Sequence, residues 1–259
     1  RFVHARGDGW SVTLDELKRG AAQIERARRL GVRTAELHRA FATPGGGEAF
    51  EPEPTTPADR EAWVAQARET AQRALGTLAA ELHRVPAGLR AEAAALVARR
   101  DEILGRIAAP PLAPAVTKTR YHGDYHLGQV LVVDDDFMIV DFEGEPGRAP
   151  EVRRRKSSPL RDVAGMLRSF NYAAVTAGSQ ALAQGWERDA AGAFLAGYRT
   201  TIAGCSSYPA DPAHAAALLD LFALEKAFYE LSYELANRPA WLRIPMEGIR
   251  AILDRTGND

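Results

Sequence analysis

Apolar residues recur at every third or fourth position through most of the chain, which is the spacing of amphipathic helices. Near the N-terminus this series comprises Leu14, Leu17, Ala21, Ile24 and Ala27. Thr13-Leu14-Asp15-Glu16 has the residue types of a capping box, in which a hydroxyl and a carboxylate satisfy the first free amides of a helix. We therefore expect a helix to begin at Thr13 and one or two helices to reach Phe41.

A pair of long helices is predicted after a loop rich in glycine and proline. This loop begins at Pro44-Gly45-Gly46-Gly47, and at its end Thr56 can cap a helix whose first turn holds Pro57. The pair covers Ala58–His83 and Pro86–Ile107. Later helices are predicted over Leu160–Thr176, Gln184–Ala203, Ala213–Ala236 and Pro245–Leu253.

Two short runs of apolar and β-branched residues interrupt the helical pattern. They are Gln129–Val133 and Phe137–Val140, and Asp134-Asp135-Asp136 separates them. Short runs around polar turn residues predict a β-hairpin. The sequence therefore predicts a mainly α fold with a small hairpin, and the hairpin would bring Gln129 close to Asp141.

Residues suited to phosphoryl transfer lie on both sides of this hairpin. Four residues separate Asp124 from Gln129, and Asp141-Phe142-Glu143 ends the second strand. Protein kinases use the order H-R-D-x-x-x-x-N and then D-F-G for a proton-accepting carboxylate, a magnesium-binding amide and a magnesium-binding carboxylate. We predict that Asp124 is the catalytic base and that Gln129 and Asp141 bind magnesium.

Two roles are open for the histidines that flank Asp124. His122 and His126 can fix the loop by hydrogen bonds behind the reacting groups. Alternatively, the i, i+2, i+4 spacing of His122, Asp124 and His126 would place all three on one face of a strand, where they could bind zinc or iron in a metallohydrolase. Neighbouring glycines weaken a regular strand, and the metal hypothesis gives the amide and the second carboxylate no role, so the supporting role is favoured.

Three blocks of sequence carry a family resemblance. They are His122–Gln129 with Ile139–Pro146, Arg153–Ser169, and Glu225–Pro245. Together they resemble the maltokinase branch of the aminoglycoside phosphotransferase and choline kinase-like enzymes. Most members of the wider superfamily carry Asn where this chain has Gln129, and Gln is itself a mark of the maltokinase branch.

The resemblance implies transfer of the ATP γ-phosphate to the anomeric hydroxyl of maltose, giving maltose 1-phosphate, with Mg²⁺ and ATP as the cofactors. It also implies a place in trehalose and glycogen metabolism, with fusion to or association with trehalose synthase. The implied fold is the C-terminal lobe of a bilobal protein-kinase-like enzyme. The β-rich lobe that covers the nucleotide in this family has no counterpart ahead of Asp8. We therefore expect this chain to belong to a longer protein, to lack full activity alone and to leave the nucleotide-binding residues unassigned.

We expect one compact lobe with three parts: N-terminal helices and loop at 1–57, a helical hairpin at 58–113, and a catalytic part at 114–259. The helix over Ala213–Ala236 carries tyrosines and glutamates along one side. Aromatic rings can stack on a sugar and carboxylates can accept its hydroxyl hydrogens. With the resemblance, Tyr229, Glu230 and Arg238 are the predicted substrate contacts.

The composition of the chain limits the classes of partner and compartment that we expect. Lys and Arg total 33 against 34 Asp and Glu, so the net charge of −1 offers no field to attract nucleic acid or an anionic membrane. Cys205 is the single cysteine, which excludes an internal disulfide and fits a reducing compartment. No apolar run is long enough to cross a membrane and no signal peptide is visible, so we expect a cytoplasmic protein.

Other functions stay open at this stage. The shared motif reports phosphoryl transfer and not the acceptor, so an aminoglycoside or an amino alcohol could replace the sugar. The chain could also be a non-catalytic sugar-binding or docking module, in which Asp124, Gln129 and Asp141 would be vestigial.

Overall fold

The computed structural model describes residues 3–107, 116–145, 149–178 and 180–255, without the side chains of 180–184 and 255. Residue contacts divide the chain into two compact units. Unit 1 comprises Arg1–Thr55 and Ala113–Ala215, and unit 2 comprises Thr56–Leu112 and Ala216–Asp259. The prediction of a mainly helical fold with small sheets is confirmed. The three-part division at 57/58 and 113/114 stays a prediction.

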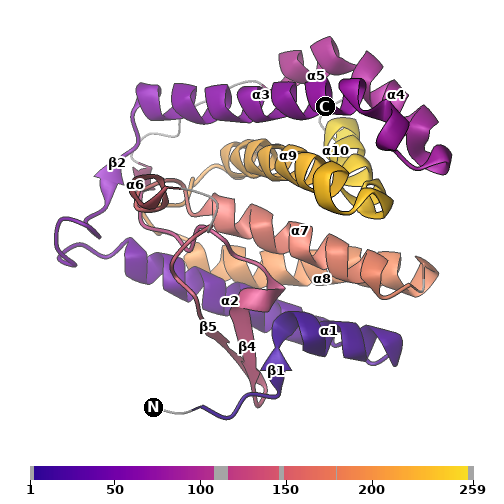
Figure 1. The fold of residues 1–259 in the computed structure, drawn as a ribbon. Helices are drawn as coiled ribbons and strands as arrows, with labels where there is room; N and C mark the ends of the chain where they lie inside the picture. The colour runs from indigo at the N-terminus through magenta and orange to yellow at the C-terminus, as the bar shows by residue number, and fades with distance from the viewer. Residues whose placement is uncertain (1–2, 108–115, 146–148, 179, 256–259) are drawn as a thin grey trace. The chain divides into compact units, whose positions relative to one another are not determined.

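Unit 1 holds the predicted hairpin. The strands β4 (Val130–Val133) and β5 (Asp136–Ile139) are antiparallel, with Val130 opposite Ile139 and Val133 opposite Asp136. A short strand β1 (Gly7–Asp8) pairs with the other edge of β4, so the sheet order is β1-β4-β5 (Figure 1). A separate sheet of two strands pairs β2 (Glu53–Pro54) with β3 (Thr117–Lys118), and β3 lies just ahead of the predicted catalytic loop in the sequence.

The helices of unit 1 pack around two long members. They are α1 (Gly9–Lys18), α2 (Ile24–Phe41), α6 (Pro150–Arg153), α7 (Leu160–Thr176) and α8 (Gln180–Ile202). The backbones of α2 and α8 approach closely because glycines lie at their contact. A Cβ on Gly31 would lie 2.0 Å from the carbonyl oxygen of Phe194, and a Cβ on Gly197 would lie 2.3 Å from that of Arg28. A side chain at either position would therefore force the two helices apart.

Unit 2 is entirely helical in its described part. It contains α3 (Pro57–Ala80), α4 (Arg90–Ala98), α5 (Arg100–Arg106), α10 (Arg243–Arg255) and most of α9 (Pro212–Asn237). Short 3₁₀ turns at Leu82–Arg84, Ala87–Leu89 and Pro239–Trp241 connect them. Trp63 of α3 is buried against Phe222 of α9, with ring centroids 5.6 Å apart and nearly perpendicular planes. None of the described helices has the length and apolar character needed to span a membrane.

The helix starts follow hydrogen-bond chemistry more than the apolar pattern. Thr56 caps α3 as predicted, and its hydroxyl and the Asp59 carboxylate form a reciprocal capping box. The capping box at Thr13 was wrong, because α1 begins at Gly9 and the Asp8 carboxylate accepts the backbone N–H of Ser11 at 2.8 Å. The second helix of the predicted pair also breaks at Arg99, which separates α4 from α5.

Candidate active site

Asp124 lies in the loop of residues 121–129, which we call the aspartate loop. Its carboxylate is 19% exposed. The buried carboxylate of Asp162, in the first turn of α7, accepts the backbone N–H groups of His122 at 2.7 Å and Gly123 at 3.0 Å. Farther along α7, the hydroxyl of Ser169 accepts the backbone N–H of Leu127 at 3.0 Å. One helix therefore fixes the backbone of the loop before and after Asp124.

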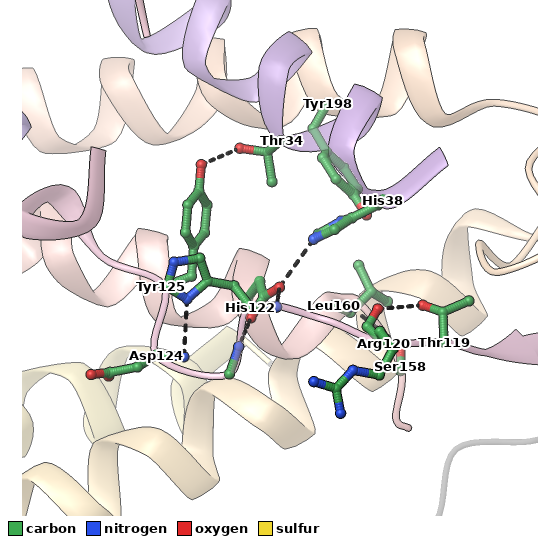
Figure 2. A network of polar contacts seen from close by, with 12 residues as sticks. Thr34, His38, Thr119, Arg120, His122, Asp124, Tyr125, Ser158, Leu160 and Tyr198 are labelled. Atoms are coloured by element: carbon green, nitrogen blue, oxygen red, sulfur yellow. Dashed lines mark hydrogen bonds and ion pairs between the residues drawn. The ribbon is translucent and has the colours of Figure 1, made fainter. Parts of the chain in front are cut away.

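Asp162 is held in turn by the buried side chain of His38, which is itself bonded to the buried Tyr198. His38 of α2 donates from Nε2 to Asp162 at 3.1 Å, and its Nδ1 lies 2.9 Å from the hydroxyl of Tyr198 on α8. Burial raises the pKa of Tyr198 well above its usual value, so the phenol keeps its proton. Figure 2 shows His38, Tyr198 and the loop residue His122 in this network.

Tyr125 anchors the loop on the side of α2. Its ring is buried and its hydroxyl lies 2.8 Å from the Thr34 hydroxyl (Figure 2). The Thr34 hydroxyl itself donates to the Leu30 carbonyl at 2.8 Å. Since the Thr34 proton is used in that bond, the Tyr125 hydroxyl is the donor. Burial raises the pKa of Tyr125, which keeps this donor protonated.

Sequence reasoning missed Asp162, His38 and Ser169 as parts of the site. One signal was readable: Asp162, Met166 and Ser169 follow helical spacing on one face of α7, and all three are buried. A carboxylate on such a face is rarely buried without partners. Nothing in the sequence could name those partners, because His38 is far from Asp162 along the chain.

The hairpin brings the two predicted metal ligands together. Gln129 precedes β4 and Asp141 follows β5, and the Gln129 amide donates to the Asp141 carboxylate at 2.8 Å. The backbone N–H of Val140 also donates to the Gln129 carbonyl at 3.0 Å. Asp141 is exposed and has a φ of 64°, a left-handed conformation that costs a non-glycine residue energy.

The two histidines near Asp124 make separate hydrogen bonds. His122 is buried, and its Nε2 donates to the Val140 carbonyl at 2.8 Å, which links the aspartate loop to the end of the hairpin. His126 is partly exposed, and its Nδ1 accepts the Gly128 backbone N–H at 3.0 Å. Across the described residues, no three His, Cys, Asp or Glu side chains are grouped as a metal site would require. The geometry thus gives no support to a zinc or iron site at His122, Asp124 and His126.

The predicted substrate contacts belong to unit 2. On α9, Tyr229 is 39% exposed, and Glu230 is buried on the same helix. Arg238 follows α9 and binds the buried carboxylate of Glu234 in a two-pronged contact, at 2.9 and 2.7 Å. Its guanidinium also lies over the rings of Tyr233 and Trp241, at 5.4 and 4.6 Å. The substrate role of Tyr229, Glu230 and Arg238 stays a prediction.

Comparisons with known proteins show that this chain is similar to sugar kinases. The particular relatives are glucosamine kinases. The protein from Mycolicibacterium smegmatis is 31% identical over 272 residues, which cover 95% of this chain and 60% of that protein. The protein from Streptacidiphilus jiangxiensis is 29% identical over 252 residues, which cover 92% of this chain and 53% of that protein. No protein-family model matches the chain.

Solved structures agree with the sequence relatives. A glucosamine kinase in complex with glucosamine, ADP and inorganic phosphate superposes with a TM-score of 0.76 at 26% identity, over 98% of this chain and 59% of that one. The structure of a glucosamine kinase in crystal form A also superposes with a TM-score of 0.76 at 26% identity, over 97% of this chain and 61% of that one. The chain thus spans little more than half the length of its curated relatives. These relatives are glucosamine kinases, so the predictions of maltose as substrate and of a role in trehalose and glycogen metabolism find no support.

Proposed function

We propose that the protein to which this chain belongs transfers a phosphoryl group from ATP to a hydroxyl of a sugar, with Mg²⁺ as the metal. The observation that carries the proposal is the 2.8 Å contact between the Gln129 amide and the Asp141 carboxylate, made across the hairpin that follows the Asp124 loop. The similarity to glucosamine kinases supports the same class of reaction. In this proposal the chain corresponds to the C-terminal lobe of a kinase-like enzyme.

Asp124 is proposed to receive the hydrogen bond, and late in transfer the proton, of the acceptor hydroxyl. Phosphoryl transfer passes through a loose transition state that asks little of a base, so orientation of the hydroxyl is its main contribution. The fixed backbone around Asp124 favours this role. His122 and Val140 tie the loop to the hairpin, which keeps base and metal ligands in one arrangement.

The residues present fit a magnesium ion. Magnesium prefers oxygen ligands and retains several waters, so one carboxylate and one amide oxygen on an accessible edge are a suitable donor set. Asp141 is exposed, and half a turn of the Gln129 amide would present its oxygen in place of its nitrogen. When bound, the ion would neutralise charge on the transferring phosphate.

The proposed acceptor is glucosamine or a close amino sugar. The named relatives are glucosamine kinases, and the buried carboxylate of Glu230 on α9 is one of the predicted substrate contacts. An ammonium group gains a charge-assisted hydrogen bond from a carboxylate, whereas the hydroxyls of maltose gain a weaker one. Tyr229, Glu230 and Arg238 are kept as the proposed substrate residues.

The deciding experiment is a phosphotransfer assay of the natural full-length protein with ATP and Mg²⁺. The acceptors are glucosamine, N-acetylglucosamine, glucose, maltose, an aminoglycoside and choline. We expect glucosamine to be the preferred acceptor, EDTA to abolish turnover, and Asp124→Asn to reduce turnover at least about a thousandfold while glucosamine still binds. Preference for maltose would restore the predicted maltokinase activity. Turnover of none of the acceptors, or full activity of Asp124→Asn, would contradict the proposal.

A further inference from the structure

His126 presents its imidazole to the carboxylate of Asp124. Its Nε2 lies 3.9 Å from Oδ2 of Asp124, and the two side chains are 43% and 19% exposed. This separation is longer than a hydrogen bond, which ends near about 3.2 Å. Hydrogen bonds of catalytic groups are commonly long before substrate enters and shorten in the complex.

The hydrogen bond at the other ring nitrogen decides where the imidazole proton sits. The backbone N–H of Gly128 donates to Nδ1 of His126 at 3.0 Å. A neutral imidazole has one donor and one acceptor nitrogen. Because Nδ1 is the acceptor, Nε2 carries the hydrogen and presents it towards Asp124.

Gly128 is explained by the position of this ring. Its φ is not positive, so its backbone conformation does not require glycine. A Cβ at this position would lie 2.8 Å from Cε1 and 3.0 Å from Nδ1 of His126. Any side chain at 128 would push the imidazole away, so the glycine leaves room for the ring beside Asp124.

The two histidines face different parts of Asp124. His122 donates from Nε2 to the Val140 carbonyl, and its Nδ1 faces the backbone N–H of Asp124 at 3.4 Å. His126 faces the side chain of Asp124 instead. The backbone and the carboxylate of Asp124 therefore face different imidazole rings.

We propose that His126 is the positioning residue of the Asp124 carboxylate, an inference that rests on the proposed phosphoryl transfer. Its Nε2–H donates to Oδ2 when the acceptor enters, and Oδ1 is then turned to the acceptor hydroxyl. The ring does not itself take the proton from the sugar, because Nε2 already carries one and Nδ1 is used by Gly128.

Two substitutions of His126 separate its role as a donor to Asp124 from its role as an acceptor for the Gly128 N–H. Gln places its amide nitrogen near the position of Nε2 and keeps a donor for Asp124, whereas Asn places its oxygen near Nδ1 and keeps only the acceptor for Gly128. In the natural full-length protein, we expect His126→Gln to keep kcat within about threefold. We expect His126→Asn to lower kcat about tenfold, the cost of one hydrogen bond, with the KM for sugar unchanged. The reverse order, with Asn active and Gln impaired, would overturn the proposal.

Gly128→Ala tests the same contact from the other side. The added methyl group displaces the ring while the imidazole remains in the chain, so we expect the same drop in kcat as for His126→Asn. The double variant should be no worse than either single one, because both remove one interaction. Additive losses would contradict the proposal.

Nitrogen NMR of the histidine side chains gives a readout that does not need turnover. We expect the Nε2–H form of His126 at neutral pH, and a change in its Nε2 shift in Asp124→Asn. If the wild-type protein phosphorylates no acceptor, the proposed function fails while this spectrum still reports the contact. The Nδ1–H form, or a spectrum unaffected by Asp124→Asn, would overturn the placement of His126.

Discussion

Asp162 connects α7 to the aspartate loop by hydrogen bonds. Its two carboxylate oxygens accept two backbone N–H groups of the loop and the Nε2–H of His38. Asp162, His38 and His122 are buried, so loss of the Asp162 acceptor would leave buried donors unsatisfied. At the residue scale, the position of Asp124 is therefore decided by a carboxylate that does not take part in the proposed reaction.

Asp162→Asn is expected to destabilise unit 1 by about 2–4 kcal/mol, because its amide nitrogen would face backbone N–H donors. Urea unfolding measures the loss, and hydrogen exchange at His122 and Gly123 should accelerate with it. Asp189→Asn is the matched control, since this carboxylate on α8 is 57% exposed, and its effect should stay within about 0.5 kcal/mol. Equal effects of the two substitutions would show that Asp162 does not hold the loop.

At the scale of elements, α2 fixes the tip of the hairpin that carries Gln129 and Asp141. Arg33 donates from Nε and Nη2 to the two oxygens of Asp136, at 2.8 and 2.5 Å, and Arg29 donates to the Asp135 carbonyl at 2.8 Å. Arg33 holds the pKa of Asp136 below its usual range. An isolated hairpin of this length is at best marginally stable, so its contacts with α2 and β1 are needed to keep the two ends together.

Arg33→Gln is expected to lower stability by about 0.5–1 kcal/mol at pH 7, a small effect because both side chains are more than a third exposed. The pKa of Asp136 is lower in the folded state than in the unfolded state. The ion pair with Arg33 therefore contributes fully to the free energy of unfolding above the unfolded-state pKa of about 3.9, and this contribution is lost as the pH falls through the folded-state pKa. The difference between wild type and variant, measured by urea unfolding, should therefore shrink below about pH 4. Glu36→Gln removes only the other partner of Arg33 and should leave the hairpin unaffected. A difference that stays constant down to pH 2 would contradict this origin.

At the scale of the whole molecule, the chain forms two units that each have their own core. Unit 1 carries the aspartate loop and the hairpin, and unit 2 is built around contacts such as that of Trp63 with Phe222. The helices of unit 2 come from two separate stretches of sequence, since 56–112 interrupts unit 1 and 216–259 completes unit 2. Damage to one core should therefore be felt first within its own unit.

Trp63→Ala is expected to cost about 3–5 kcal/mol, as for other buried aromatic truncations. Hydrogen exchange should rise more at amides of α3 and α9 than at those of α2 and α8. Gln66→Ala, exposed on the same helix, is the control and should change neither region. A uniform rise across both units would mean that they unfold as one.

The sequence by itself determined the helical class, the hairpin, and the pairing of Gln129 with Asp141, because local spacing sets the period of an element and a two-stranded turn must return the chain on itself. It failed at the start of α1, where an aspartate cap at Asp8 competed with an equally good capping sequence. Only the tertiary structure decided that His38, Asp162 and Ser169 support the loop, and that the ring of His126 lies over Gly128 beside Asp124. Those contacts join residues from different helices or depend on side-chain placement, and neither is encoded in the spacing of residue types along the chain.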